Sequence, residues 1–482
     1  MPNKRVIMLL IDSLMYPALK LAIQEKKAPA FEFFINKGKL YENIVTPFPT
    51  MSVNVDSSLL TGTYANVHQI PGLVWFNEKE QRLINYGSHI RELFKLGIKT
   101  SLEDIFYNIN NVHLNTEIKT LHEELEEQGK TTASINGLMY RGNVEKKLKW
   151  PLIFSFISTL GNKTITKGTH TFTYGSFSKV SPSKKHGHFW KKYGFNDAFS
   201  AKELSYLIKH NNLPDFSMIY FPDMDQMVHK NGPMDIKGIS KVDQKIQKIL
   251  NLYSSWEEAL KENIWIILGD NGQAPIDSNR SKALIDLRTI LHSFNIMKLR
   301  ERKPKENQIV LGVNERMAFI YSNKSSITTI VQSLQNDERI DVIAFKKDQN
   351  IHVQSGSIEG EFIFKPNGPY VDQYEQSWDV SGNHDILNLS IENQQIHYHD
   401  YPDALARLYS SLTSHEGNYI VVSAKPNFEF IGEGSPTHVG GASHGGLHKQ
   451  DSLIPMIVIG TEKAPKHLRM IDLKEWILSI IK

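Results

Sequence analysis

Five short stretches of this chain each combine an apolar run with a metal-type ligand or a hydroxyl, although together they span more than four hundred residues. Such continuous apolar runs are typical of buried strands, and the carboxyl ends of parallel strands meet at one edge of a sheet. The stretches are Val6–Ile11 before Asp12; Pro47–Leu60 with Thr50 and Ser52; Met218–Phe221 before Asp225 and His229; Ile264–Leu268 before Asp270; and Ala442–Gly446 with His444. Hydroxyls, carboxylates and imidazoles at five such ends favour a two-metal hydrolase site.

The composition is that of a globular chain with little net charge. The sequence has 482 residues, of which 40% are hydrophobic and 22% charged, and its formal net charge is +3. This length predicts about two to four domains, or one large domain with insertions. The near-neutral charge argues against a dedicated nucleic-acid-binding protein, which would carry a basic stripe.

The sequence also bears on location and metal chemistry. No apolar run approaches the roughly 18–20 residues of a membrane span. The basic segment Met1–Arg5 leads into Val6–Ile11, a run too short for a secretory signal. We therefore predict a cytoplasmic protein without membrane association. Because the chain contains no cysteine, a metal ion would have to be held by His, Asp, Glu, Asn or hydroxyl groups.

Strands and helical patterns alternate in the first half of the chain. Lys39–Val45 and Thr131–Asn136 are predicted strands, whereas Ala28–Lys37, Thr116–Gln128 and Ile239–Leu260 have helical patterns. This alternation predicts an α/β fold with a mostly parallel central sheet between helices.

The character of the chain changes after residue 275. Short apolar runs separated by Asn, Gly and Lys predict a smaller β-rich insertion or cap over residues 276–435, with some core elements. Residues 1–275 and 436–482 are predicted to form the catalytic core. Within it, the basic and aromatic segment Lys184–Lys192 is expected to be a solvated surface loop, with a substrate-capturing patch as the alternative.

Several candidate ligands also have an ordinary structural explanation. Asp12 could cap the helix that follows its strand. Asp225 and His229 are four residues apart, so a helix would place both on one face, but such pairs are common on surfaces. The sequence Asp270-Asn271-Gly272 could be a simple turn, although the burial expected for the preceding strand favours a site.

The histidines are weighed in the same way. His444 precedes two glycines, which would let the backbone approach an ion closely. His438 and His448 flank it, and each alone is expected to be structural or exposed. Alternation would place His397 and His399 on one strand face, but no further ligand type lies nearby in the sequence pattern, so we expect no metal there.

In this order, the stretches resemble the alkaline phosphatase superfamily and, within it, the type I phosphodiesterase/nucleotide pyrophosphatase family. The resemblance covers residues 5–77, 216–275 and 436–460, and its most specific tract is FPTMSVNVDSSLLTGTYANVHQIPG. In this family a nucleophilic Thr or Ser lies nine residues before the Thr of a Thr-Gly pair. Counting back from Thr61 implies that Ser52 is the nucleophile, with Thr50 as the runner-up. A helix cap or a turn hydroxyl is the alternative role.

The resemblance also implies two divalent metal ions. One would be bound by Asp12, Ser52, Asp270 and Asn271, and the other by Asp225, His229 and His444. The family usually has a His directly after the Asp that corresponds to Asp270, so Asn271 is a departure. Its neutral oxygen binds Zn²⁺ less well than an imidazole, which makes Mn²⁺ or Mg²⁺ plausible at that ion position. Zn²⁺ suits the imidazole-rich position.

A metal-bound hydroxyl suggests how such a site would act. A serine or threonine oxygen on a metal ion is held largely as alkoxide and attacks phosphorus in line, after which water cleaves the phospho-enzyme. The family also uses an Asn for a phosphate oxygen, for which Asn77 is the nearest candidate although its spacing differs.

These observations predict a metal-dependent phosphodiesterase or nucleotide pyrophosphatase acting on a small-molecule phosphoester. A phosphomonoesterase or phosphonate hydrolase on the same scaffold is the related alternative, but monoester cleavage needs extra cations, and no Arg or Lys motif lies near the hydroxyl tract. A non-catalytic protein with a degraded metal site is the second class, motivated by Asn271. Oligomeric state is not predicted.

Overall fold

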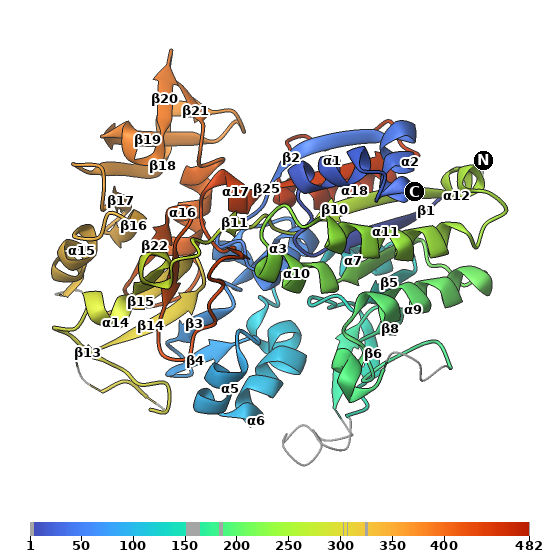
Figure 1. The fold of residues 1–482 in the computed structure, drawn as a ribbon, viewed down its shortest axis with the longest axis horizontal. Coiled ribbons are helices and arrows are strands. Elements are labelled where there is room, and N and C mark those ends of the chain that lie inside the picture. The colour runs from blue at the N-terminus through green and yellow to red at the C-terminus, as the bar shows by residue number, and fades with distance from the viewer. Residues whose placement is uncertain are drawn as a thin grey trace.

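The computed structural model describes residues 4–150, 164–182, 187–301, 303–305, 307–322 and 326–481. Two large sheets organise this part of the chain. In Figure 1 the central sheet and its helices lie to the right, and a second, ten-stranded sheet lies to the left. The predicted fold class is confirmed: the central sheet is mostly parallel and lies between helices.

The central sheet has seven strands. Their order is β2 (Lys39–Val45), β25 (Leu453–Ile459), β10 (Asn263–Gly269), β1 (Arg5–Ile11), β9 (Phe216–Phe221), β5 (Thr132–Ile135) and β8 (Thr171–Thr173). All pairs from β10 to β8 are parallel, whereas β25 runs antiparallel to both of its neighbours. Strands β1, β9 and β10 are apolar and almost entirely buried, as expected for strands covered on both faces.

Alternate residues of β1 enter two different cores, one on each face of the sheet. Ile7, Leu9 and Ile11 pack with residues of one set of helices, and the intervening residues face the other. The first set is α1 (Tyr16–Gln24), α2 (Pro29–Lys37), α9 (Asp197–Lys209), α11 (Ile236–Leu250) and α12 (Trp256–Glu262). The second set is α3 (Ser52–Thr61), α7 (Leu121–Glu127) and α18 (Leu473–Ile480).

The second sheet is formed between residues 295 and 424 and is mostly antiparallel. Its strands are, in order, β13 (Asn295–Ile296), β14 (Gln308–Asn314), β15 (Met317–Tyr321), β22 (Tyr419–Ala424), β16 (Ile340–Lys347), β17 (Asn350–Gln354), β18 (Phe362–Asp372), β21 (Gln395–Tyr398) and β20 (Leu389–Glu392), with β19 (Ser377–Gly382) on β18. Helices α15 (Ile327–Gln335) and α16 (Ala404–Leu412) pack on it.

Small elements complete the fold. Four short pairs are β3 (Val74–Asn77) with β4 (Arg82–Asn85), β6 (Val144–Lys147) with β7 (Ile165–Gly168), β11 (Ala274–Pro275) with β24 (Ala442–Ser443), and β12 (Leu284–Asp286) with β23 (Glu429–Ile431). Within the described residues, further helices are α4 (Ala65–His68), α5 (Ile90–Leu96), α6 (Ile98–Glu103), a π-helix (Asp104–His113), α10 (Asp223–Asn231), α13 (Arg280–Ala283), α14 (Leu287–Ile290), α17 (Lys449–Ser452) and 3-10 turns at Phe189–Gly194, His384–Leu387 and Met470–Asp472.

Two predicted helices were too long. The helix expected from residue 116 begins at Leu121, because the Thr120 side chain accepts from the backbone N–H of Glu123 and starts the helix in a capping box. The helix expected to reach residue 260 ends at Leu250, and a new one begins after Ser255, whose side chain accepts from the N–H of Glu258. The capping residues, and not the apolar periodicity, therefore determine where these helices begin.

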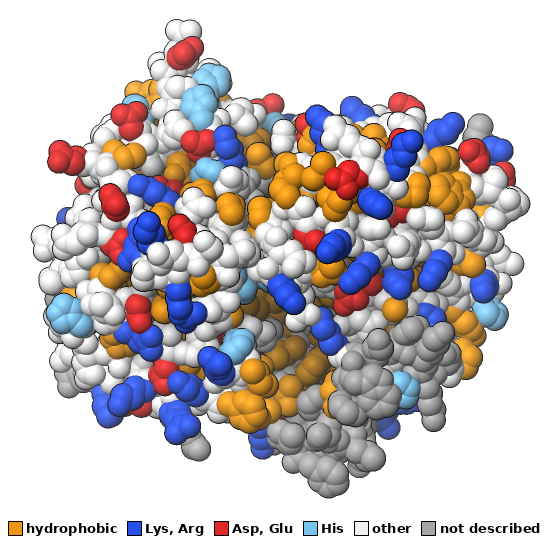
Figure 2. Space-filling model, viewed as in Figure 1, with side chains coloured by type: hydrophobic (Ala, Val, Ile, Leu, Met, Phe, Trp, Pro, Cys, Tyr) orange, Lys and Arg blue, Asp and Glu red, His pale blue; other side chains and the backbone are white. Residues whose placement is uncertain are grey.

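The surface carries no single dominant charge on the face shown in Figure 2, where basic side chains are interspersed with acidic ones. The tip of the predicted loop Lys184–Lys192 lies partly outside the described residues, and its end enters the Phe189–Gly194 turn. Among the described residues, none of the helices combines the length and hydropathy that crossing a bilayer requires.

Candidate metal centre

Three aspartates meet where neighbouring parallel strands end. Asp12 follows β1, Asp225 lies in the first turn of α10 after β9, and Asp270 follows β10. The backbone N–H of Asp12 still bonds to the carbonyl of Phe221 at 3.0 Å, and the N–H of Ser13 donates to Oδ1 of Asp270 at 2.8 Å. The sheet therefore brings together carboxylates that are more than 250 residues apart in sequence.

One group of ligands, which we call the imidazole group, consists of Asp225, His229 and His444. Oδ1 of Asp225 lies 3.1 Å from Nε2 of His229 and 3.8 Å from Nε2 of His444. The other ring nitrogens are oriented by the backbone: Nδ1 of His229 bonds to the carbonyl of Ala442 at 2.8 Å, and Nδ1 of His444 to that of Thr50 at 2.7 Å. Both Nε2 atoms are thereby aimed at the carboxylate, an arrangement suited to a divalent ion.

The backbone around these histidines is tightly packed. A Cβ added to Gly441 would lie 1.9 Å from the carbonyl oxygen of His229, so only glycine allows the loop carrying His444 to approach α10 this closely. The glycine-rich sequence before His444 thus has a structural purpose, because it positions the imidazole group.

The charges of the imidazole group compensate one another. Burial opposes the ionisation of Asp225, but His229 and His444 bring its pKa below the usual range. Burial likewise acts against a charged His229, yet Asp225 and Glu315 raise its pKa to about 10. The group therefore holds opposite charges in mutual contact when no ion is bound.

The second group, which we call the carboxylate group, consists of Asp12, Ser52, Asp270 and Asn271. Burial raises the pKa of Asp12 well above its ordinary value, and the charges of Asp270 and Asp225 add to the rise. Burial also raises the pKa of Asp270, while the N–H of Ser13 and the hydroxyl of Ser52 act in the opposite direction. Two carboxyl groups therefore face each other away from water, where their joint ionisation is opposed.

Ser52 begins α3, where backbone N–H groups have no helical partner and favour a phosphate group. Thr50 is fully buried, and its hydroxyl accepts from the N–H of Gly445 at 2.7 Å, while its carbonyl orients His444. Of the two hydroxyls, Ser52 interacts with Asp270 and Thr50 supports the loop that carries His444.

Asn77 is not brought into either group. It ends strand β3 of the β3–β4 hairpin, and its side-chain oxygen accepts from the N–H groups of Lys79 and Glu80 in the turn that follows. His397 and His399 belong to the second sheet and its edge, and His399 contacts the hydroxyl of Ser390.

Three residues of the centre were missed by the sequence analysis. Oγ of Ser13 lies 3.0 Å from Oδ1 of Asp225 and 3.1 Å from Oδ1 of Asn271, and it accepts from Nε2 of Gln273 at 2.8 Å. Ser13 thereby bridges the two groups, with a positive φ of 60°. Its position next to Asp12 was a usable signal, as was that of Gln273 two residues after Asn271. Glu315 comes from the second sheet and gave no such signal.

The buried donor set fits divalent cations. In the carboxylate group, Oδ2 of Asp270 and Nδ2 of Asn271 are buried without a hydrogen-bond partner. An unpaired buried carboxylate oxygen beside a second carboxylate is costly, and a cation would remove that cost. The imidazole group offers the nitrogen and oxygen ligands that Zn²⁺ accepts, whereas the carboxylate group offers only oxygens that harder ions prefer.

Comparison with known proteins gives three findings. The family model described as type I phosphodiesterase / nucleotide pyrophosphatase matches residues 6–384. Among curated protein sequences nothing matches the chain. Among solved structures, murine and human ectonucleotide pyrophosphatase / phosphodiesterase 5 resemble it with TM-scores of 0.57 and 0.58, at 12% and 13% identity, over 99% of this chain and 95% of theirs.

A third similar structure is an inactive variant of the murine protein in complex with AMP. Its TM-score is 0.56 at 12% identity, with the same coverage of 99% of this chain and 95% of that one. At these identities the three structures establish a shared fold, which agrees with the central sheet described above.

Proposed function

This chain belongs to the type I phosphodiesterase / nucleotide pyrophosphatase family, and from this premise we propose that it is a two-metal phosphodiesterase or nucleotide pyrophosphatase that uses Ser52 as nucleophile. One observation supports the proposal: Ser52 begins α3, and its hydroxyl lowers the pKa of Asp270, at the edge where the imidazole and carboxylate groups meet. A hydroxyl among metal ligands at a helix N-terminus suits attack on a phosphoester.

The residues divide into two ion-binding sets. Asp225, His229 and His444 would hold one divalent cation, which we propose to be Zn²⁺. Asp12, Ser52, Asp270 and Asn271 would hold the other, where Zn²⁺, Mn²⁺ or Mg²⁺ are candidates. When bound, the ions would lower the pKa of the Ser52 hydroxyl and neutralise charge on the phosphoryl oxygens.

Ser52 then acts in two steps. Its Oγ attacks phosphorus in line with the leaving oxygen, so that the bond from Oγ to phosphorus forms as the bond to the leaving group breaks. Backbone N–H groups in the first turn of α3 would donate to the phosphoryl oxygens. The hydroxyl proton of Ser52 ends on the leaving oxygen. Water then cleaves the serine phosphodiester: its hydroxyl joins phosphorus, and its other proton returns to Oγ of Ser52. Thr50 keeps His444 in place through both steps.

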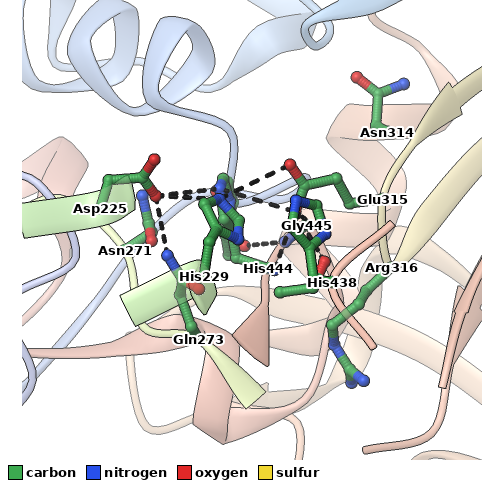
Figure 3. A network of polar contacts seen from close by, with 12 residues as sticks. Asp225, His229, Asn271, Gln273, Asn314, Glu315, Arg316, His438, His444 and Gly445 are labelled. Atoms are coloured by element: carbon green, nitrogen blue, oxygen red, sulfur yellow. Dashed lines mark hydrogen bonds and ion pairs between the residues drawn. The ribbon is translucent and has the colours of Figure 1, made fainter. Parts of the chain in front are cut away.

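The surroundings favour a diester over a monoester. Arg316 lies next to Glu315 in sequence, but Figure 3 shows its guanidinium pointing away from the centre. It is fully buried and donates to Asp451 at 2.8 Å and to the carbonyls of Ala424, Lys425 and Phe428. It is therefore not free to neutralise the additional charge of a monoester.

The substrate class is proposed from the related structure that contains AMP. We propose a small phosphodiester or pyrophosphate with a nucleoside monophosphate portion. The cytoplasmic location remains a prediction from sequence.

Turnover and metal content test the proposal together. Purified protein is assayed with a nitrophenyl phosphodiester beside nitrophenyl phosphate, before and after chelation and after adding back Zn²⁺ or Mn²⁺, with bound metal measured throughout. We expect about two ions per chain, faster diester cleavage, loss of turnover on chelation and its recovery with metal. Less than one ion per chain and no turnover of either ester would favour a non-catalytic protein with a degraded site, the alternative that Asn271 motivates. Faster monoester cleavage would favour the monoesterase alternative.

A further inference from the structure

A second carboxylate approaches the imidazole group from the β-rich sheet. Glu315 lies in the turn between β14 and β15. Its Oε1 is 3.8 Å from Nε2 of His229, and its Oε2 is 3.9 Å from Nε2 of His444. Figure 3 shows the two imidazoles between Asp225 on one side and Glu315 on the other. The same nitrogen atoms that face Asp225 therefore also face Glu315.

The turn that carries Glu315 is fixed against the loop of His444. The hydroxyl of Ser443 donates to Oε2 of Glu315 at 2.6 Å, and the N–H of Arg316 donates to the carbonyl of His444 at 3.0 Å. A Cβ on Gly445 would lie 2.5 Å from the carbonyl oxygen of Asn314, so the two segments are in close contact. The side chain of Glu315 is only 11% exposed, and its position is thus set by packing.

The distances from the two imidazoles to each carboxylate are close to those between ligands of a single tetrahedral ion. Zinc lies about 2.0–2.2 Å from nitrogen and carboxylate ligands, so two ligands of one tetrahedral ion are about 3.4 Å apart. The nitrogens of His229 and His444 are 3.1 and 3.8 Å from Asp225 and 3.8 and 3.9 Å from Glu315. Shifts of a few tenths of an ångström would bring both carboxylates to such separations from the imidazoles.

We propose that Glu315 is a fourth protein ligand of the ion held by Asp225, His229 and His444. This inference rests on the metal centre of the proposed function and adds a specific property to it. A catalytic zinc ion usually has three protein ligands and one open position, whereas four protein ligands close the site. A phosphoester that uses this ion must therefore displace Glu315 or expand the coordination.

His438 forms an alternative group with His229 and Glu315. This group cannot hold an additional ion while the first is bound, because Nδ1 of His229 is used by Ala442 and only Nε2 remains. Nδ1 of His438 is also occupied, since it contacts Glu429 at 2.8 Å, and the ring stacks on His229 with centroids 4.1 Å apart. His438 therefore supports the ring of His229 in the present geometry.

Cobalt substitution tests the proposal without relying on turnover. Co²⁺ is added to the metal-free protein, and its affinity and visible absorption are measured, because four-coordinate Co²⁺ absorbs more strongly than five- or six-coordinate Co²⁺. We expect strong absorption from the wild-type imidazole site. Glu315→Gln should weaken Co²⁺ affinity there by about 100-fold and reduce the absorption. Glu433→Gln is the matched control, since Glu433 pairs with Lys95 away from the centre.

Glu315→Asp separates coordination from charge balance and provides a second variant should Glu315→Gln fold poorly. It keeps the negative charge near the imidazoles but withdraws the carboxylate by one methylene. We expect it to lose the strong absorption as well. Unchanged affinity and spectrum in both Glu315 variants would overturn the proposal while leaving the metal centre intact. Absence of Co²⁺ binding by the wild type would instead overturn the proposed function, and this inference with it.

Discussion

The two halves of the metal centre differ in how they tolerate the absence of an ion. In the imidazole group, Asp225 faces two histidines, Glu315 lies against the same histidines, and opposite charges offset the cost of burial. In the carboxylate group, Asp12 and Asp270 face each other, and Oδ2 of Asp270 has no hydrogen-bond partner. The protein itself therefore balances the charges of the imidazole group. The carboxylate group lacks such a balance, and a bound cation would supply it.

The largest expected effect lies on the carboxylate side. Ser52→Ala should reduce diester turnover by about 10⁴-fold or more, because it removes the attacking oxygen. It should leave the metal ion of the imidazole group in place, since Ser52 is not among the ligands of that ion. Initial rates and metal content of the same preparation check both statements.

Thr50→Ala is the control for Ser52→Ala. We expect it to remain active with a moderate loss, because it removes only the hydroxyl that accepts from Gly445 and leaves the backbone bond to His444. An inactive Thr50→Ala beside an active Ser52→Ala would show that Thr50 is the nucleophile.

The pH dependence of stability should separate the two halves in metal-free protein. The pKa of His229 is about 10 when folded and near 6.5 when unfolded. Its contribution to stability is therefore complete below pH 6.5 and is lost as the pH rises toward 10, by at most about 1.4 kcal/mol per pH unit. Asp12 and Asp270 have raised pKa values, so their contribution to stability is lost at lower pH than that of His229, as the pH rises above 3.8.

Thermal unfolding between pH 5 and 10, in the presence of chelator, measures these changes. His229→Gln should flatten the decline above pH 6.5, and His397→Gln, an exposed substitution in β21, should not. Equal slopes in wild type and His229→Gln would contradict the charge compensation assigned to the imidazole group.

Isosteric substitutions should shift metal-free stability in opposite directions. Asp270→Asn removes one of two facing carboxylates and should raise the free energy of unfolding by about 1–2 kcal/mol. Asp225→Asn removes the charge that faces His229 and should lower it by about 1–3 kcal/mol. Each should also reduce bound metal by one ion per chain. Denaturant unfolding and metal analysis provide the measurements, and a shift of the same sign in both variants would break the comparison.

The smallest expected effect is a gain in Zn²⁺ affinity at the carboxylate group. Asn271→His should raise Zn²⁺ affinity at the Asp12 and Asp270 position by about tenfold, because an imidazole is a better zinc ligand than an amide oxygen. A Zn²⁺ titration of the Asp225→Asn background isolates this position. Affinity unchanged by the substitution would place residue 271 outside the ligand set.

The sequence was informative where a candidate ligand directly follows a recognisable strand pattern. Apolar runs followed by Asp12, Asp225 and Asp270 predicted both the central sheet and the convergence of its strand ends, because a parallel sheet brings carboxyl ends together. Helix limits were less well predicted, as at Leu121, because caps such as Thr120 outweigh periodicity.

The contributions of the second sheet could not be read from sequence. Glu315 lies in an ordinary turn between two strands, and nothing in its neighbours marks it as close to His229. The role of Thr50 is similar, since its hydroxyl and carbonyl are used by a loop almost 400 residues later. Ser13 became significant only once the strands were side by side and its hydroxyl reached Asp225 and Asn271.

The sequence by itself determined the α/β class, the family resemblance and the ligand types at the strand ends, because these depend on patterns within a few residues. Tertiary structure decided which hydroxyl faces Asp270, how the charges of the two groups differ and that Glu315 joins the histidines. Those properties depend on distances, burial and the local field, and these arise only when separate segments pack together.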